Sequence, residues 1–279
     1  MKTILVPTDF SSHSENALRA AASIAKEQQA KLVVVHMAGI SDSHLSKEEA
    51  SSALESVFYM KLSEKRFAEF LDQPYLDGLT VTEAIKKHKN FTELNDVAKE
   101  VSADLIVMSS HGSSGLQELL LGSNTEKVVR TSDIPVLVIK ETLTDFKINT
   151  AVFASDFTLE TVEAFKKARN WCATFNASMN MVYVNTPGPE FRSSQEIDEV
   201  LFRFFEALGS EDPSEQVNQV AIVSDYKIED GIFNYSQMID ADIIAMPTHG
   251  RKGLSHVLKG SLSEDIANHA VKPVLTIKI

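Results

Sequence analysis

Short apolar runs alternate along the chain with longer segments in which apolar residues recur every three or four positions. Ile4 to Val6, Leu32 to Met37 and Leu105 to Met108 are continuously apolar, which is typical of strands that are buried on both faces. Between the first two runs, Ser14 to Gln28 carries its apolar residues at helical spacing. Strands that alternate with helices in this way predict a parallel sheet covered by helices on both sides.

The same alternation continues to the end of the chain. It predicts strands at 4–6, 32–37, 79–81, 105–108, 136–139, 151–154, 179–184, 217–223, 243–246 and 274–277. It predicts helices at 14–28, 47–71, 91–101, 124–131, 159–175, 193–208, 228–239 and 261–270.

The second half of the chain repeats the first. Ala103 to Leu116 aligns without a gap with Ala241 to Leu254, at an offset of 138 residues. Thr3 to Phe10 aligns with Thr150 to Phe157 at an offset of 147, so the second copy is shorter between its second and fourth strands. We therefore interpret the chain as a duplication.

The duplication predicts two domains. We expect the first at residues 1–140 and the second at 149–279, joined by a short polar linker at 141–148. A length of 279 residues agrees with a two-domain chain.

Composition excludes several classes of protein. The net charge of −12 has the wrong sign for a general nucleic-acid binder or a protein that binds anionic membranes. The single cysteine, Cys172, excludes a disulfide scaffold and fits a reducing compartment. No apolar run approaches the roughly 18 residues that a membrane span needs, and Pro7 and Asp9 come too early for a signal peptide. We expect a cytoplasmic protein.

Candidate binding residues stand at the ends of the first and fourth strands of each copy. In a doubly wound sheet these two strands flank the point where strand order reverses, and ligands bind beyond their carboxyl ends. Strand one ends in Pro7-Thr8-Asp9 or Ala154-Ser155-Asp156, and strand four runs into Ser109-Ser110-His111-Gly112 or Pro247-Thr248-His249-Gly250.

A glycine and a serine follow Gly112 and Gly250 after nine intervening residues, at Gly122-Ser123 and Gly260-Ser261. Glycines let a phosphate approach the backbone, and a helix start favours an anion. Ser123 with Glu126 also fits a capping box, which needs no ligand. Spacing alone leaves nucleotide binding and plain helix capping both open.

At these residues the chain resembles the universal stress protein family, in its tandem two-domain form. The first strand and the spaced Gly-Ser pairs carry the resemblance, which covers nearly the whole chain in two copies. It implies two doubly wound, parallel five-stranded sheets of order 3-2-1-4-5, Rossmann-like and similar to the adenine-nucleotide alpha-hydrolases. It also implies binding of ATP or AMP, as in one subset of the family, with Mg²⁺ possible beside ATP.

The resemblance assigns roles position by position. Asp9 and Asp156 would contact adenosine, the backbone of Met37 and Val184 would meet adenine, and glycines would cradle the phosphates beside a serine hydroxyl. The nucleotide-binding residues that it implies are Pro7, Thr8, Asp9, Met37, Met108, Ser109, Gly112, Gly122, Ser123 and Asn124 in the first copy, and Ala154, Ser155, Asp156, Val184, Met246, Gly250, Gly260, Ser261 and Leu262 in the second.

Two positions depart from the family pattern. Its first glycine is Ser109 in one copy and Pro247 in the other. Serine keeps a backbone N–H, whereas proline has none and stiffens the turn. The second copy adds Arg251 and Lys252, which could meet phosphates. Which copy binds therefore stays open.

Three functions follow in order of preference. The first is a nucleotide-dependent switch in stress response or signalling, with a protein partner. The second is a nucleotide-free interaction module, and the third is a slow nucleotide hydrolase. We assign no catalytic residue and no metal ligand, because no general base is positioned beside the phosphate loop and His249 and His256 lack a third ligand at metal spacing.

The last strand of each copy predicts how the copies assemble. Val136 to Ile139 and Val274 to Ile277 would each lie at a sheet edge. An apolar edge with unpaired backbone groups promotes aggregation unless it is covered. We expect the two strands to meet antiparallel, which would make the chain an internal pseudo-dimer.

Overall fold

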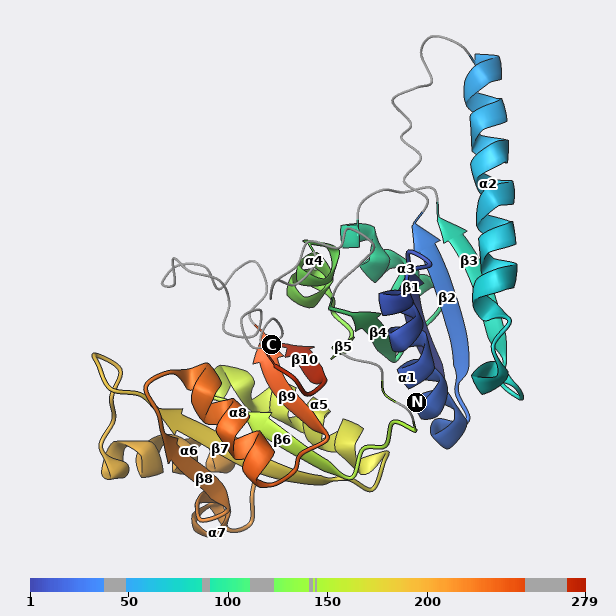
Figure 1. Ribbon diagram of the computed structural model, residues 1–279. Helices are drawn as coiled ribbons and strands as arrows, with labels where there is room; N and C mark the ends of the chain where they lie inside the picture. The colour runs from blue at the N-terminus through green and yellow to red at the C-terminus, as the bar shows by residue number, and fades with distance from the viewer. Residues whose placement is uncertain (38–48, 87–90, 111–122, 141–142, 144, 249–269) are drawn as a thin grey trace. The chain divides into compact units, whose positions relative to one another are not determined.

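The computed structural model describes residues 1–37, 49–86, 91–110, 123–140, 143, 145–248 and 270–279 (Figure 1). The chain divides into two compact units, Met1–Phe146 and Lys147–Ile279. Within the described residues each unit has five strands.

Unit 1 alternates strands and helices along its length. Its elements are β1 (Thr3–Thr8), α1 (Ser12–Gln28), β2 (Lys31–Met37), α2 (Glu49–Leu71), the 3-10 turn η2 (Pro74–Leu76), β3 (Val81–Lys86), the 3-10 turn η3 (Phe91–Glu93), α3 (Leu94–Glu100), β4 (Leu105–Ser109), α4 (Ser123–Thr131) and β5 (Val136–Ile139).

Unit 2 repeats this succession. Its elements are β6 (Thr150–Ala154), the 3-10 turn η4 (Leu159–Thr161), α5 (Val162–Ala173), β7 (Ser178–Asn185), α6 (Ser194–Leu208), α7 (Pro213–Val217), β8 (Val220–Ser224), α8 (Ile228–Met238), β9 (Ile243–Thr248) and β10 (Val274–Lys278). The helix expected at 261–270 falls almost entirely outside the described residues.

The strand order of the two units is the same. In unit 1 the order is β3-β2-β1-β4-β5, and in unit 2 it is β8-β7-β6-β9-β10. Every pairing within each unit is parallel. The expected doubly wound sheet of order 3-2-1-4-5 is therefore confirmed in both units.

The strands form the core because most of their side chains are apolar and buried. All six residues of β1 are buried, as are all four of β5. Helix α1 packs on β4 and β1 through small side chains such as Ala17, Ala21 and Ala25. Small residues let the helix lie close to the sheet, so its backbone as well as its side chains excludes water.

Aromatic rings fill much of the core of unit 2. Phe165 of α5 stacks edge-on against Phe153 at 5.2 Å and against Phe204 at 5.4 Å. Phe157 meets Phe204 edge-on at 5.2 Å. Edge-to-face pairs at this spacing are favoured by the ring quadrupoles, so they fix α5 and α6 against the sheet.

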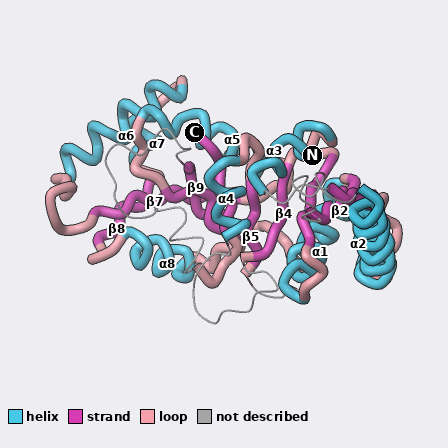
Figure 2. The backbone as a smooth tube through the Cα atoms, turned by 90° about the horizontal axis from the view of Figure 1, so that it is seen from above, coloured by secondary structure: helices cyan, strands magenta, loops and turns pink. Residues whose placement is uncertain are grey.

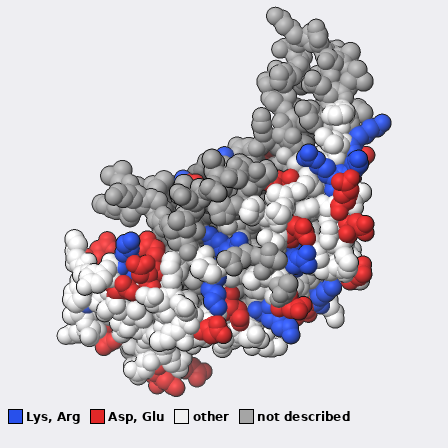
Figure 3. All heavy atoms as spheres, in the orientation of Figure 1, with Lys and Arg blue, Asp and Glu red and all other residues white. Residues whose placement is uncertain are grey.

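Helices cover both faces of each sheet. Figure 2 shows α3 and α4 on one face of unit 1 with α1 on the other, and α5 and α6 on one face of unit 2 with α8 on the other. Acidic and basic residues intermingle on the part of the surface that Figure 3 describes. No helix in the described part of the chain is both long and apolar enough to cross a bilayer.

Three elements differ from the sequence expectation. The strand expected at 217–223 is β8 at Val220–Ser224, and Val217 ends α7 instead. The third strand, expected at 79–81, lies instead at Val81–Lys86. Its Val-Thr-Glu-Ala-Ile-Lys sequence is half polar because it is an edge strand that is partly exposed. The short helix α7 was not expected at all; it is only five residues long, and none of them is buried.

Candidate functional site

The two central strands of each sheet stop pairing before their carboxyl ends, which is where a doubly wound fold forms its ligand crevice. β1 pairs with β2 over six residues but with β4 only at Ile4 and Leu5. β6 pairs with β9 only over Ala151 to Phe153. Both ladders end before their strands do, so the residues that follow line the two walls of a crevice at the strand-order reversal.

The direction of each backbone amide follows from the alternation along a strand. The N–H groups of Ile106 and Ser110 donate to carbonyls on the β5 side of β4. Because successive amides in a strand point to opposite neighbours, the amide of Ser109 faces β1 and the crevice. Pro7 faces the same crevice from β1, since Asp104 donates to Thr3 on that side.

Unit 2 has the reverse arrangement. The N–H of Ile244 donates to Pro273 on the β10 side of β9, so the nitrogen of Pro247 faces the crevice. On the opposite wall the amide of Ala154 faces it from β6, since Asp242 donates to Thr150. Each crevice thus has a proline on one wall, and neither proline interrupts a ladder.

The carboxylate of Asp9 lies at the start of a tight turn between β1 and α1. Its Oδ1 accepts hydrogen bonds from the backbone N–H of Ser11 at 3.0 Å and from the Ser11 hydroxyl. Thr8 Oγ1 accepts the Phe10 N–H at 2.9 Å and lies 3.0 Å from Ser14 Oγ. Phe10 adopts a left-handed φ of 63°.

Unit 2 has the same turn. Asp156 Oδ1 accepts the N–H and the hydroxyl of Thr158, both at 3.2 Å. Ser155 Oγ accepts the Phe157 N–H at 3.0 Å and donates to Thr161 Oγ1 at 3.2 Å. Phe157 has a φ of 53°. Thus the two predicted adenosine-contacting aspartates occupy equivalent, pre-formed turns.

The ends of the second strands differ more between the units. In unit 1 the Nδ1–H of His36 donates to the Thr8 carbonyl at 2.8 Å, and its ring stacks on Phe10 at 4.5 Å. The next residue, Met37, is buried. The β2 end is therefore tied directly to the turn that holds Asp9.

In unit 2 the segment after β7 is held by hydrogen bonds between Arg192 and residues of that strand. Asn185 donates to the carbonyl of Arg192 at 2.8 Å and accepts its N–H at 3.2 Å. The Arg192 guanidinium donates to the Tyr183 hydroxyl at 3.4 Å. The predicted adenine-contacting Val184 lies beside Gly231 of α8, where an added Cβ would be 2.6 Å from Val184 Cγ1.

Helix α4 begins beside the crevice of unit 1. It starts at Ser123, and its first turn is fastened to β4 because the Thr125 hydroxyl donates to the Ser109 carbonyl at 2.8 Å. Met108 is buried, Ser109 is half-buried and Asn124 is exposed. The structure therefore brings Ser109, the start of α4 and the Asp9 turn to one end of the sheet.

The rest of the predicted site falls partly outside the described residues. In unit 2, Met246 is buried and Pro247 is half-buried. The other predicted residues that lie outside the described part are Gly112, Gly122, Gly250, Gly260, Ser261 and Leu262, together with His111, His249, His256, Arg251 and Lys252.

Several residues of the turns escaped the sequence analysis. Ser14 and Thr161 complete the hydrogen-bonded turns, and Thr125 fixes α4. A signal for the first two was present: the repeat aligns Asp-Phe-Ser-x-x-Ser with Asp-Phe-Thr-x-x-Thr. A hydroxyl recurs at both spacings, which marks a turn that both copies share.

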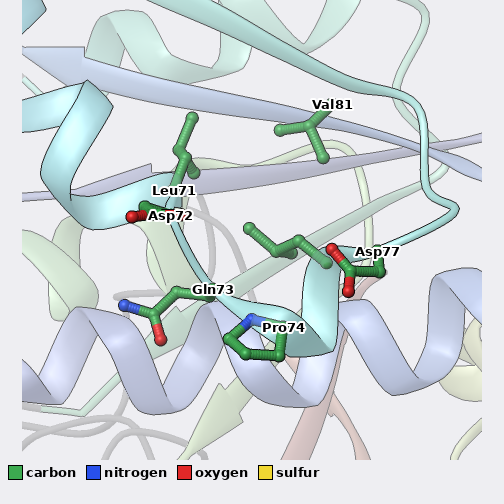
Figure 4. A pocket seen from close by; sticks show the side chains of 7 residues that line it. Leu71, Asp72, Gln73, Pro74, Asp77 and Val81 are labelled. Carbon is green, nitrogen blue, oxygen red and sulfur yellow. The ribbon is translucent and has the colours of Figure 1, made fainter.

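Other chemistry is sparse in the described part of the chain. No group of three or more histidine, cysteine or acidic residues there has the arrangement of a metal site. Burial raises the pKa of the Cys172 thiol to about 11, which makes it an unreactive core residue. A pocket of about 430 Å³ lies where α2 meets η2 and includes Asp72 and Asp77 (Figure 4); it adjoins the amino-terminal end of β3 at Val81 and includes no residue from the carboxyl end of a strand.

Comparisons with known proteins agree with this fold. The model of the universal stress protein family matches residues 1–140 and again 147–278. A universal stress protein of Methanocaldococcus jannaschii is 32% identical over 153 residues, which cover 50% of this chain and 82% of the relative. One from Bacillus subtilis is 32% identical over 152 residues, covering 49% of this chain and 97% of the relative.

Among solved structures, a universal stress protein from Archaeoglobus fulgidus matches with a TM-score of 0.65 and 20% identity, over 99% of this chain and 98% of that one. That likeness shows a shared fold along the whole length. The family model accounts for both halves of the sequence separately, as the internal repeat predicts. The chain therefore belongs to the universal stress protein family, with the family's domain present twice.

Proposed function

We propose that the chain binds an adenine nucleotide, ATP or AMP, in the crevice of unit 1, and that binding switches its interaction with a protein partner. The observation that carries the proposal is the early end of the β1–β4 ladder. It leaves the Ser109 amide and the Asp9 turn at the two sides of one crevice, with the start of α4 beside them. Membership of the family supports the same ligand.

These groups suit the parts of a nucleotide. A carboxylate accepts hydrogen bonds from a ribose hydroxyl or an exocyclic amine. Backbone N–H groups at a strand end and at a helix start attract phosphate oxygens. Since the Asp9 carboxylate is already oriented by Ser11, little ordering is needed when the ligand arrives.

Two differences favour unit 1 over unit 2. Ser109 has a backbone N–H on the β4 wall, whereas Pro247 at the matching position of β9 has none. Asp9 is also half-buried while Asp156 is exposed, and a hydrogen bond to a carboxylate is stronger where water is excluded. We infer that unit 1 binds the nucleotide more tightly than unit 2 does, and that unit 2 contributes mainly to the internal pseudo-dimer.

The aspartate pair supplies a matched test. Calorimetric titration of the full chain with ATP and with AMP should show that Asp9→Ala weakens binding at least about tenfold, the loss expected for one charge-assisted hydrogen bond. Asp156→Ala, which removes the same turn from unit 2, should change the affinity less than about twofold. Asp9→Asn keeps an oxygen that can accept the Ser11 N–H but removes the negative charge. It therefore distinguishes the loss of the ligand contact from the loss of the turn.

Three results would contradict the proposal. No binding of either nucleotide by the wild-type chain would favour the nucleotide-free interaction module. Equal losses in Asp9→Ala and Asp156→Ala would contradict the preference for unit 1. Steady release of phosphate from ATP would favour a nucleotide hydrolase over a switch.

A further inference from the structure

The unit 1 sheet carries a second pocket, which begins at Thr3 and Lys31 at the amino-terminal ends of β1 and β2 and extends along β3 to its last residue, Lys86. It has a volume of about 560 Å³. Thr3, Lys31 and Val33 line it from β1 and β2, and Thr82, Ala84 and Lys86 from β3. The strand register places these side chains on one face of the sheet, and the residues around the end of α3 form its rim.

This face is open because α3 is short. Helix α3 has seven residues and packs mainly against η3 and α4 rather than on β2 and β3. In unit 2 the corresponding helix α8 has eleven residues and packs directly on β7 and β8. The open pocket is therefore a feature of unit 1.

Three lysine side chains bring positive charge to this pocket. Lys2, Lys31 and Lys86 all line it. Lys86 Nζ is 2.6 Å from Glu100 Oε2, and Asp104 is occupied by the backbone N–H groups of Lys2 and Thr3. Within the described part of the chain no carboxylate forms an ion pair with Lys2 or Lys31. Two ammonium groups thus remain available to a ligand.

The repeat shows that this charge is specific to unit 1. At the offset of 147 residues, Lys2 and Lys31 correspond to Asn149 and Ser178. The strand registers match Lys86 to Val223. All three positions are neutral in unit 2, although Asp242 keeps the same anchoring role as Asp104. The lysines are therefore not required by the fold.

We propose that this pocket binds a small organic anion whose carboxylate or phosphate group is held by Lys2 and Lys31. Its volume lies within the range of small-molecule sites. Val33 and Ala84 offer an apolar floor, and the Thr82 and Ser102 hydroxyls offer further donors. Thr3, at the amino-terminal end of β1, is six positions from Asp9, which is about 20 Å of strand, so an anion held by Lys2 and Lys31 and a nucleotide at Asp9 bind at different places.

The test uses citrate and glycerol phosphate as probes, one for each anionic group. Titration of the full chain, followed by amide chemical shifts, should perturb Thr3, Ala84 and Ser102 for at least one probe. Lys31→Glu should weaken that binding at least about tenfold. Lys65→Glu is the control because Lys65 is an exposed residue of α2 and the substitution changes the net charge equally; it should change the affinity less than about twofold.

Two outcomes would overturn the proposal: no perturbation of these amides by either probe, or equal weakening by Lys31→Glu and Lys65→Glu, which would show a general charge effect. Lys31→Gln removes the charge without reversing it. It replaces Lys31→Glu in the same titration if Lys31→Glu does not fold. Asp9→Ala should leave anion binding unchanged, so failure here is distinct from failure of the nucleotide proposal.

Discussion

In each unit one phenylalanine in the left-handed conformation lies at the carboxyl end of the first strand, beside the candidate site. Phe10 and Phe157 follow the crevice aspartates and have φ values of 63° and 53°. A bulky residue in this region costs of the order of 1–3 kcal/mol. Hydrogen bonds from the Phe10 and Phe157 N–H groups to the hydroxyl oxygens of Thr8 and Ser155, together with the packing of the rings, offset that cost. The same strain at the same place in both copies supports a role in orienting the carboxylate.

The close approach of Gly231 to Val184 gives a prediction at the same scale. A Cβ at position 231 would lie 2.6 Å from Val184 Cγ1, a branched side chain on a strand. Gly231→Ala should therefore lower the free energy of unfolding by about 1–3 kcal/mol, although alanine favours a helix. Urea denaturation measures the change.

The control for Gly231 is a double-mutant cycle. In a Val184→Ala background both close contacts with Val184 are gone and only Asp225 Cβ, at 3.3 Å, remains close to the added Cβ, so Gly231→Ala should destabilise the fold much less. Equal destabilisation in both backgrounds would show that the contact with Val184 is not the cause.

Among the elements, α6 has the most completely capped start. Ser193 Oγ accepts the Glu196 N–H at 3.3 Å, and Glu196 Oε2 accepts the Ser193 N–H at 2.8 Å. Ser193→Ala should lower the free energy of unfolding by about 1 kcal/mol, because the Glu196 N–H loses its acceptor. Ser194→Ala, one position along and outside the capping box, is the matched control and should be near neutral in thermal or urea unfolding.

The capping box also sets a pH dependence. Hydrogen bonds from the Ser193 N–H and hydroxyl lower the pKa of Glu196 below its usual 4.5. A carboxyl group whose pKa is lowered on folding stabilises the fold above its unfolded pKa, and this contribution is lost as the pH falls through the folded value. The difference in stability between wild type and Ser193→Ala should therefore shrink below pH 4.5; a constant difference down to pH 3 would contradict this role.

The order of the elements could be predicted from the sequence because buried parallel strands are continuous apolar runs. The β1, β2, β4 and β5 runs all lie where the pattern indicates. β3 was misplaced because an edge strand exposed to water keeps polar residues such as Thr82 and Glu83 and loses that pattern. α7 was missed because a helix with no buried face has no hydrophobic periodicity.

The site was predictable only in part. The repeat and the family resemblance point to the strand ends, and the structure brings Asp9, Ser109 and Ser123 to one end of unit 1. The direction of the Pro7 and Pro247 nitrogens could not be predicted, because it depends on ladder register rather than on residue type. The pocket with Lys2 and Lys31 could not be predicted from the sequence either, because its lining comes from three strands that meet only in the fold.

On the scale of the whole molecule, we propose domains at 1–140 and 149–279 whose last strands pair antiparallel in an internal pseudo-dimer. Alternation along β5 and β10 turns the amides of Val138 and Thr276 away from the neighbouring strand of their own unit. If the two strands pair, these amides should exchange with deuterium as slowly as the central amides of β1.

Exchange followed residue by residue on the full chain tests this arrangement. Slow exchange at Val138 and Thr276 supports it, and the amides that face β4 and β9 provide an internal control because each sheet already protects them. Fast exchange at Val138 and Thr276 beside slow exchange at the control amides would refute the pseudo-dimer.

The central claim is that this duplicated chain binds one adenine nucleotide tightly, in unit 1. Native mass spectrometry of the full chain with AMP or ATP counts the nucleotides bound to each molecule. We expect one bound nucleotide at low ligand concentration, lost in Asp9→Ala and retained in Asp156→Ala. A chain that carries none at any concentration up to the millimolar range, or that keeps its nucleotide in Asp9→Ala and loses it in Asp156→Ala, would contradict it.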